Sequence, residues 1–156
     1  MATREDIVRE AREWINTPWA HQQNIKGLAC DCEGFNEGVA VNVGITGLAV
    51  VARNYRRSED GSLMLKILQE NLEFVTGSDT REAPDMSEVQ AGDIVAFSDE
   101  QLRRPDKPCH LGIISERRPD GVLKVIHASE HGVREHRMDA RWLRRIHSVW
   151  KVKDIE

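Results

Sequence analysis

The sequence predicts an α+β protein in which helices come first and a small antiparallel sheet follows. Helical spacing of apolar residues dominates the chain before residue 75, whereas short β-branched runs separated by turn residues dominate from Ala91 onward. No repeat or linker divides the two halves, and 156 residues suit one shared core. Residues 1–156 are therefore predicted to form a single domain.

The first helix is predicted over residues 4 to 15. Thr3 and Asp6 have the spacing of a capping box, with aspartate in place of the usual glutamate, and apolar residues then recur at helical intervals. Pro18 stops the pattern because the residue before a proline is pushed out of the α region. The following segment, Trp19 to Ala29, has no periodicity and is expected to be a loop.

A second helix is predicted over residues 32 to 43, where Phe35 and valines alternate with small residues as in a closely packed, buried helix. The chain from 44 to 62 is expected to be a spacer with a short helical piece over 48–52. Ser62 then caps an amphipathic helix that runs towards Leu72, after which a strand begins near residue 74.

The second half of the chain predicts a sheet of about five strands. The runs at 94–97, 111–114 and 122–126 are expected to be three successive antiparallel strands. Residues 133–138 and 148–152 add a fourth and a fifth strand, with a helical turn over 139–143 between them.

The composition disfavours two classes of partner. The net charge is -4 with both signs interspersed, so the sequence has neither a nucleic-acid footprint nor a polybasic membrane anchor. The N-terminus runs directly into a charged helix, and no stretch reaches the ~18 apolar residues of a membrane span. We therefore expect no signal peptide, synthesis in the cytoplasm, and neither nucleic acid nor membrane as a partner.

Cys32 is the candidate nucleophile. It stands at a predicted helix start, where unpaired N–H groups carry about half a positive charge and lower the pKa of a thiol. Asp31 is placed to cap this helix, and Gly34 leaves room beside the thiol for backbone or substrate. The alternative is an inert buried cysteine. Three cysteines, two of them one residue apart, do not form a disulfide framework in a chain of this size.

Two histidines are candidates for the base that a catalytic cysteine needs. His110 begins one predicted strand and His127 ends the next, with a Pro-Asp-Gly turn at 119–121 between the strands. In a hairpin, the start of the first strand lies beside the end of the second, so both imidazoles are expected at one edge of the sheet.

Five motifs, in this order, resemble those of the NlpC-type (p-sixty) cysteine peptidases, papain-like enzymes that cut bacterial cell-wall peptides. They are Thr17-Pro18-Trp19, Asp31-Cys32-Glu33-Gly34, Gly92-Asp93-Ile94-Val95, His110-Leu111-Gly112-Ile113 and Ile126-His127-Ala128. The compact branch of phage cell-wall peptidases is the most similar, through His21-Gln22, Lys26-Gly27, Asp60-Gly61 and the stretch 133–137.

This resemblance implies a papain-like fold and a catalytic triad of Cys32 as nucleophile, His110 as general base and His127 as the residue that orients His110. It implies hydrolysis of peptidoglycan stem peptides, at the bond between D-glutamate and the diamino acid, with no metal or cofactor. It leaves two settings open: a phage tail, with phage tail proteins as partners and a place in the virion, or a bacterial cell.

The resemblance and the local sequence together indicate four residues that contact substrate: Trp19, His21, Asp31 and Gly34. Family members usually carry tyrosine where this chain has Trp19, which offers only an indole N–H donor. For Asp31, helix capping is the competing role, and for His21 it is simple surface exposure. The other histidines, His131, His136 and His147, are expected to be structural or solvated.

Three other functions stay open. Cys30, Cys32, Cys109, His110 and His127 could form a structural zinc module, although the Cys-x-Cys and Cys-His pairs lack the usual gap of two to four residues. Without such a site, Cys30 is expected to be a small buried apolar residue. The same fold could also serve as a non-catalytic phage-tail component, or as an amidase or acyltransferase acting on another amide.

Overall fold

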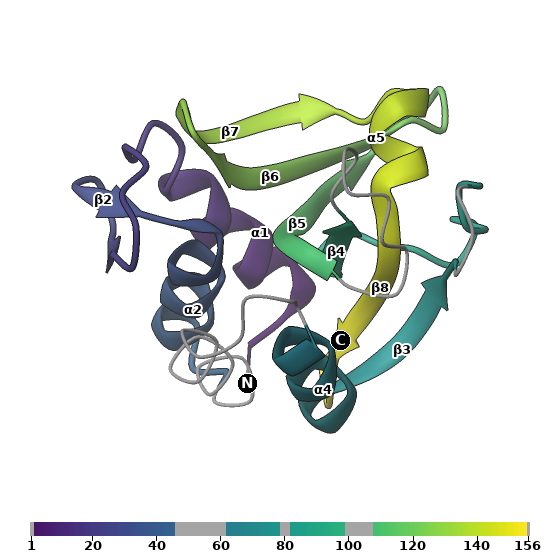
Figure 1. Cartoon of the computed structure of the whole chain (residues 1–156), viewed down its shortest axis with the longest axis horizontal. Coiled ribbons are helices and arrows are strands. Elements are labelled where there is room, and N and C mark those ends of the chain that lie inside the picture. The colour runs from purple at the N-terminus through teal and green to yellow at the C-terminus, as the bar shows by residue number, and fades with distance from the viewer. Residues whose placement is uncertain (1, 46–61, 79–81, 99–107, 156) are drawn as a thin grey trace.

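The computed structural model describes residues 2–45, 62–78, 82–98 and 108–155 (Figure 1). The predicted helical piece at 48–52 lies outside the described residues. The described helices are α1 (Arg4–Glu13), α2 (Cys32–Asn42), α4 (Ser62–Asn71) and α5 (Ala140–Arg145). The predicted α+β class is confirmed.

The main sheet is antiparallel and has the strand order β3-β8-β4-β5-β6-β7. Its strands are β3 (Leu72–Gly77), β4 (Ile94–Ser98), β5 (Pro108–Arg117), β6 (Leu123–Ser129), β7 (Gly132–Arg137) and β8 (Ile146–Val152). The expected count of about five is one too low, because the strand predicted near residue 74 joins the same sheet as an edge strand, β3, paired with β8. The last strand, β8, lies between β3 and β4. A small hairpin of β1 (Asn24–Ile25) and β2 (Ala29–Cys30) precedes α2.

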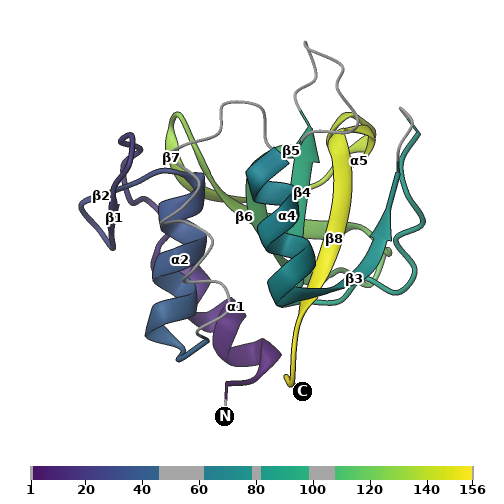
Figure 2. The same cartoon turned by 60° about the horizontal axis from the view of Figure 1, so that its bottom comes forward.

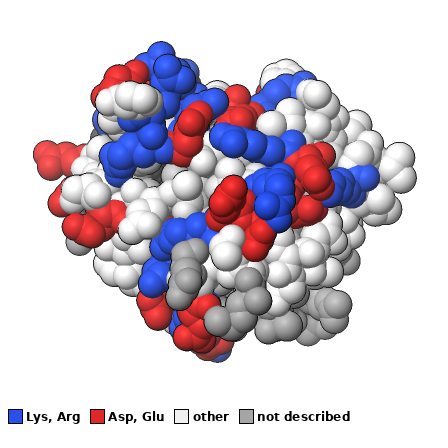
Figure 3. Space-filling model, turned by 180° about the vertical axis from the view of Figure 1, so that it is seen from behind, with Lys and Arg blue, Asp and Glu red and all other residues white. Residues whose placement is uncertain are grey.

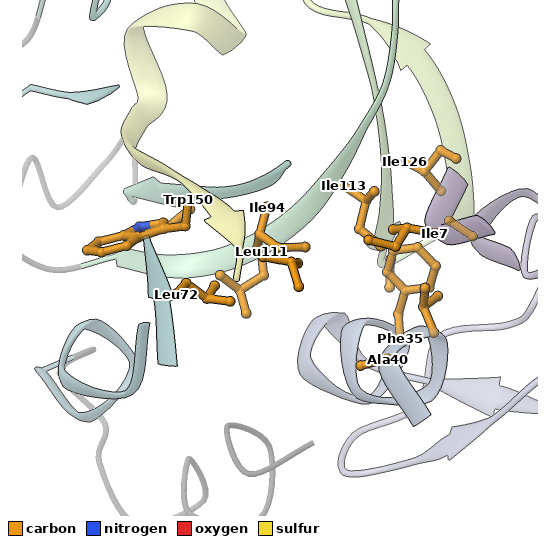
Figure 4. Close-up of a cluster of buried hydrophobic side chains, with 14 of the residues drawn as sticks. Ile7, Phe35, Ala40, Leu72, Ile94, Leu111, Ile113, Ile126 and Trp150 are labelled. Carbon is orange, nitrogen blue, oxygen red and sulfur yellow. The ribbon is translucent and has the colours of Figure 1, made fainter. Parts of the chain in front are cut away.

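The sheet is covered on both faces. On one face, α1, α2 and α4 bury the larger apolar cluster, part of which is drawn in Figure 4 with Ile7, Phe35 and Leu111 labelled (Figures 2 and 4). A smaller cluster on the other face contains Phe97 and Ile114 and is packed by side chains of α5. Along β4 and β5, residues of one cluster alternate with residues of the other, as expected for strands that are buried on both faces.

The first helix begins at the predicted capping box and ends two residues earlier than predicted, at Glu13. Trp14, directly after it, is buried against α2, where its ring packs edge-on to Phe35 with centroids 6.0 Å apart. A Cβ atom at Gly38 would lie 2.2 Å from the Trp14 ring. The small residues of α2 are therefore what allow α1 to approach it.

A partly buried ion pair links α1 to the segment just before β4. Arg4 donates to the Asp93 carboxylate at 2.6 Å, and the other carboxylate oxygen accepts the backbone N–H of Gln90 at 2.8 Å. Asp93 is fully buried just before β4. Removing one partner of a buried pair leaves an uncompensated charge.

We expect Arg4→Ala to lower the free energy of unfolding by about 3 kcal/mol, because the Asp93 carboxylate would stay buried without its cation. The matched control is Arg9→Ala, which removes an exposed ion pair with Asp6 and should cost less than about 1 kcal/mol. Urea denaturation of the two variants measures the difference. Equal losses would show that the pair with Asp93 does not anchor α1.

The surface carries both signs of charge side by side, as Figure 3 shows for the face opposite to that of Figure 1. Two pairs illustrate this: Arg12 with Glu135, and Lys124 with Glu116, each at 3.1 Å. Among the described helices, none has the length and apolar character needed to cross a bilayer.

Candidate active site

Cys32 is the first residue of α2, as predicted, and Asp31 is its N-cap. One Asp31 carboxylate oxygen accepts the backbone N–H of Gly34 at 2.8 Å, and the other accepts that of Gln22 at 2.7 Å. A Cβ atom at Gly34 would lie 1.9 Å from the carbonyl oxygen of Gln23. The space left by Gly34 is thus filled by the backbone of the preceding loop, which Asp31 also holds against the helix start.

The Cys32 thiol is buried, and its pKa is raised, contrary to the sequence-based expectation. Burial is the main cause, followed by the Glu33 carboxylate, to which the thiol donates a hydrogen bond at 2.9 Å. A hydrogen bond from the backbone of Leu111 acts in the opposite direction and lowers the pKa. Burial and a neighbouring anion outweigh the helix N-terminus, so the thiol is protonated at neutral pH and needs a base to be activated.

The predicted hairpin is present and brings the two histidines together. Strands β5 and β6 pair antiparallel, and Nε2 of His110 lies 2.8 Å from Nδ1 of His127. Leu111, whose backbone contacts the Cys32 thiol, directly follows His110 in the chain. The start of β5 therefore lies beside the start of α2, with the candidate nucleophile and base on adjoining elements.

A third imidazole extends this pair. Nε2 of His127 lies 2.7 Å from Nε2 of His136 on β7, and Nδ1 of His136 lies 2.8 Å from the carbonyl oxygen of Arg137. We call His110, His127 and His136 the histidine row. His127 pairs with Arg134 across the ladder, so His136 is its diagonal neighbour on the same face.

Trp142 of α5 covers the row. Its ring centroid lies 4.9 Å from that of His127 and 4.9 Å from that of His136. It also packs edge-on to Phe97, whose ring lies 5.9 Å from that of His110. The imidazoles are consequently held between the sheet and an aromatic cover, which limits their rotation.

Burial keeps the first two imidazoles neutral. It is the main cause that lowers the pKa of His110 to about 4, and the positive charge of Arg145 adds to it. Burial also lowers the pKa of His127 to about 2, with further contributions from His110, His136 and Arg145. Both rings therefore carry a single proton at neutral pH, which is the form in which His110 can accept a proton.

These lowered pKa values predict how stability depends on pH. Below pH 6.5 the unfolded chain protonates both histidines, whereas the folded chain keeps His110 neutral down to a pH of about 4. The unfolded state then binds more protons, so the free energy of unfolding falls as the pH drops through this window. We expect a shallower fall in His127→Gln than in a control, His131→Gln, whose histidine is exposed. Urea denaturation between pH 7.5 and 4.5 measures both slopes, and equal slopes would contradict the prediction.

Trp19, His21 and Cys30 lie in the segment before α2, and Cys109 lies at the start of β5. Trp19 is 44% exposed, and its ring centroid lies 6.5 Å from that of the exposed His21. Cys30 is fully buried, which raises the pKa of its thiol to about 12, while Cys109 is exposed. Within the part of the chain that the structure describes, no three His, Cys, Asp or Glu side chains are placed to hold a metal ion.

Sequence reasoning missed three side chains of this site. His136 was assigned a structural or solvated role, although the resemblance to the phage-type branch included its strand. Glu33, beside the thiol, and Trp142, over the row, carried no signal of their own. The spacing of His127 and His136 on either side of a two-residue turn is the one sequence feature that could have indicated a cross-strand pair.

Known structures share this fold. A protein similar to a lipoprotein of the NLP/p60 family from Staphylococcus aureus superposes with a TM-score of 0.63 at 16% identity, covering 98% of this chain and 41% of that one. NlpC1 from Trichomonas vaginalis superposes with a TM-score of 0.58 at 10% identity, covering 97% of this chain and 45% of that one. The NlpC/p60 domain of the peptidoglycan hydrolase SagA superposes with a TM-score of 0.56 at 17% identity, covering 97% of this chain and 100% of that one.

The chain thus has the papain-like fold of NlpC/p60 domains, and it spans less than half the length of the first two of these structures. No family model and no curated protein matches the sequence.

Proposed function

We propose that this chain is a cysteine peptidase that hydrolyses amide bonds in peptidoglycan stem peptides. The observation that carries the proposal is the hydrogen-bonded pair of His110 and His127 beside the helix start that bears Cys32. A thiol at a helix start and an oriented neutral imidazole on the adjoining strand are the two groups that nucleophilic catalysis requires. The fold shared with a peptidoglycan hydrolase domain supports the substrate class.

The reaction begins with transfer of the Cys32 proton to His110 as sulfur attacks the amide carbonyl. The tetrahedral intermediate collapses when the C–N bond breaks and His110 returns the proton to the leaving amine, which leaves a thioester on Cys32. Water, deprotonated by His110, then attacks the thioester carbonyl; the C–S bond breaks, the acid product leaves, and His110 returns the proton to the Cys32 sulfur. The backbone N–H of Cys32 at the helix start is our candidate donor to the oxyanion, a contribution worth about 3 kcal/mol in other acyl-transfer enzymes.

Protonation states in the resting protein are consistent with this order of events. The raised pKa of Cys32 keeps the thiol protonated, and the lowered pKa of His110 keeps its lone pair available. The catalytic ion pair would therefore form during attack rather than before it. In the resting state the Cys32 thiol donates its hydrogen bond to Glu33. In this mechanism that hydrogen bond must break when substrate enters, so that the thiol proton can pass to His110.

For the bond that is cleaved, we propose the one between D-glutamate and the diamino acid. The test is mass spectrometry of a soluble stem peptide, L-Ala-D-Glu-diamino acid-D-Ala, after incubation with the protein. The expected product is a fragment with a new amine on the diamino acid. Fragments cut only at another amide would overturn this assignment, and products in which the acyl group is joined to an added amine would indicate an acyltransferase.

Trp19 is proposed to line the substrate cleft in place of the family's usual tyrosine. Its exposed ring, beside His21 in the loop that leads to Cys32, supports this role. We expect Trp19→Tyr to keep or raise kcat/KM on the soluble stem peptide, because the restored hydroxyl can hydrogen-bond in the cleft. A collapse of activity with an unchanged circular dichroism spectrum would show instead that the indole itself shapes the cleft.

The likeness to phage cell-wall peptidases leads us to propose the phage-type branch of the family, with phage tail proteins as partners and a place in the virion. One motif of that likeness, residues 133–137, contains His136 of the histidine row. Detection of the chain among the proteins of purified virions would support this assignment, and its absence from them would count against it.

A further inference from the structure

The hydrogen bonds of the histidine row have a fixed direction. A carbonyl oxygen can only accept, so Nδ1 of His136 must carry a proton and donate it to the carbonyl oxygen of Arg137, 2.8 Å away. When the His136 ring holds a single proton, its Nε2 is then an acceptor. The proton in the 2.7 Å contact between His136 and His127 must therefore belong to Nε2 of His127.

The same reasoning continues to the base. A neutral His127 with its proton on Nε2 has a lone pair on Nδ1, which accepts the Nε2–H of His110 at 2.8 Å. A neutral His110 with its proton on Nε2 has its lone pair on Nδ1. One backbone carbonyl thus determines, through three rings, which nitrogen of His110 is basic.

We propose that His136 is a positioning residue that acts through His127 to hold His110 in the tautomer with a free Nδ1 lone pair. This inference rests on the proposed function, since it takes His110 as the base. The alternative tautomer of His127, with its proton on Nδ1, would turn that nitrogen into a donor. Nε2 of His110 would then have to accept, and its Nδ1 would carry the proton instead of the lone pair.

The surroundings of His136 fit a fixed ring. Trp142 packs against both His127 and His136 and is itself covered by Arg145, whose guanidinium carbon lies 4.6 Å from the centre of the indole ring. The strand register also matters, because a shift of one residue between β6 and β7 would turn His136 to the opposite face.

The direct test is nitrogen NMR of the imidazoles in protein labelled with ¹⁵N-histidine, which distinguishes protonated from bare ring nitrogens without any substrate. In the wild type we expect protons on Nδ1 of His136 and on Nε2 of His127 and His110. His136→Phe keeps a ring in place but removes the acceptor, and we expect the Nδ1–H form of His127 and His110 to increase. Unchanged tautomers in His136→Phe would overturn the proposal, even in a fully active enzyme.

Turnover provides the second readout. His136→Phe should lower kcat on the soluble stem peptide by at least about 10-fold, up to the ~10⁴-fold that a wrong base tautomer costs in a serine peptidase. His136→Gln, whose side-chain oxygen can accept from His127, should recover part of the rate and the wild-type tautomers. The control His131→Gln should match the wild type. Equal rates in the Phe and Gln variants would contradict a role as acceptor. If the wild type shows the expected tautomers but cleaves no stem peptide, the positioning role of His136 is upheld and the proposed function is refuted.

Discussion

Cys32→Ala is expected to abolish hydrolysis of the stem peptide, while Cys30→Ala and Cys109→Ala retain most of it. Cys32 alone begins a helix beside the strand that carries His110, whereas Cys30 is buried in the core and Cys109 is exposed. Without a thiol no covalent intermediate can form, and loss of a nucleophile costs about 10⁶-fold in kcat in a well-studied serine peptidase.

Steady-state cleavage by the three purified variants, with circular dichroism to confirm folding, measures this difference. Cys109→Ala is the sharper control, because it changes an exposed thiol next to His110 without opening a cavity. Equal loss in all three variants, together with stoichiometric zinc by elemental analysis, would replace the catalytic interpretation with a structural metal site.

His110→Gln is expected to reduce turnover to background, whereas His127→Gln should retain a measurable rate. The base takes the thiol proton and returns it to the leaving amine, and an amide side chain cannot do this. The orienting residue only needs to accept the Nε2–H of His110, which the side-chain oxygen of glutamine can do.

The turnover rates of His110→Gln and His127→Gln are measured with the same stem peptide, at a pH where all variants are folded. Since His127 also bonds His136, its replacement should cost more than that of His136 by Gln. Activity that survives at position 110 but is lost at position 127 would mean that the two roles are reversed.

The parts of this site that the sequence predicted are those determined by local pattern. Asp31 before Cys32 is a helix-capping signal that needs no information about the rest of the fold. His110 and His127 were placed together because a short turn between two strands brings the start of one beside the end of the other. Each of these depends only on neighbouring stretches of chain.

The parts that the sequence did not predict depend on tertiary packing. The raised pKa of Cys32 results from burial and from the rotamer of Glu33, neither of which a helix start reveals. The place of β8 between β3 and β4 is set by pairing between distant segments. His136 joins the row only through the exact register of β6 and β7, and the same residue one position along would face the other side.

The most direct test of the proposed activity is digestion of purified, insoluble peptidoglycan by the wild-type protein and by Cys32→Ala, followed by mass spectrometry of the released fragments. We predict that the wild type releases stem-peptide fragments with a new free amine on the diamino acid, and that Cys32→Ala releases none. Fragments released equally by both proteins, or no fragments from a folded wild type, would contradict the claim that Cys32 is the nucleophile of a cell-wall peptidase.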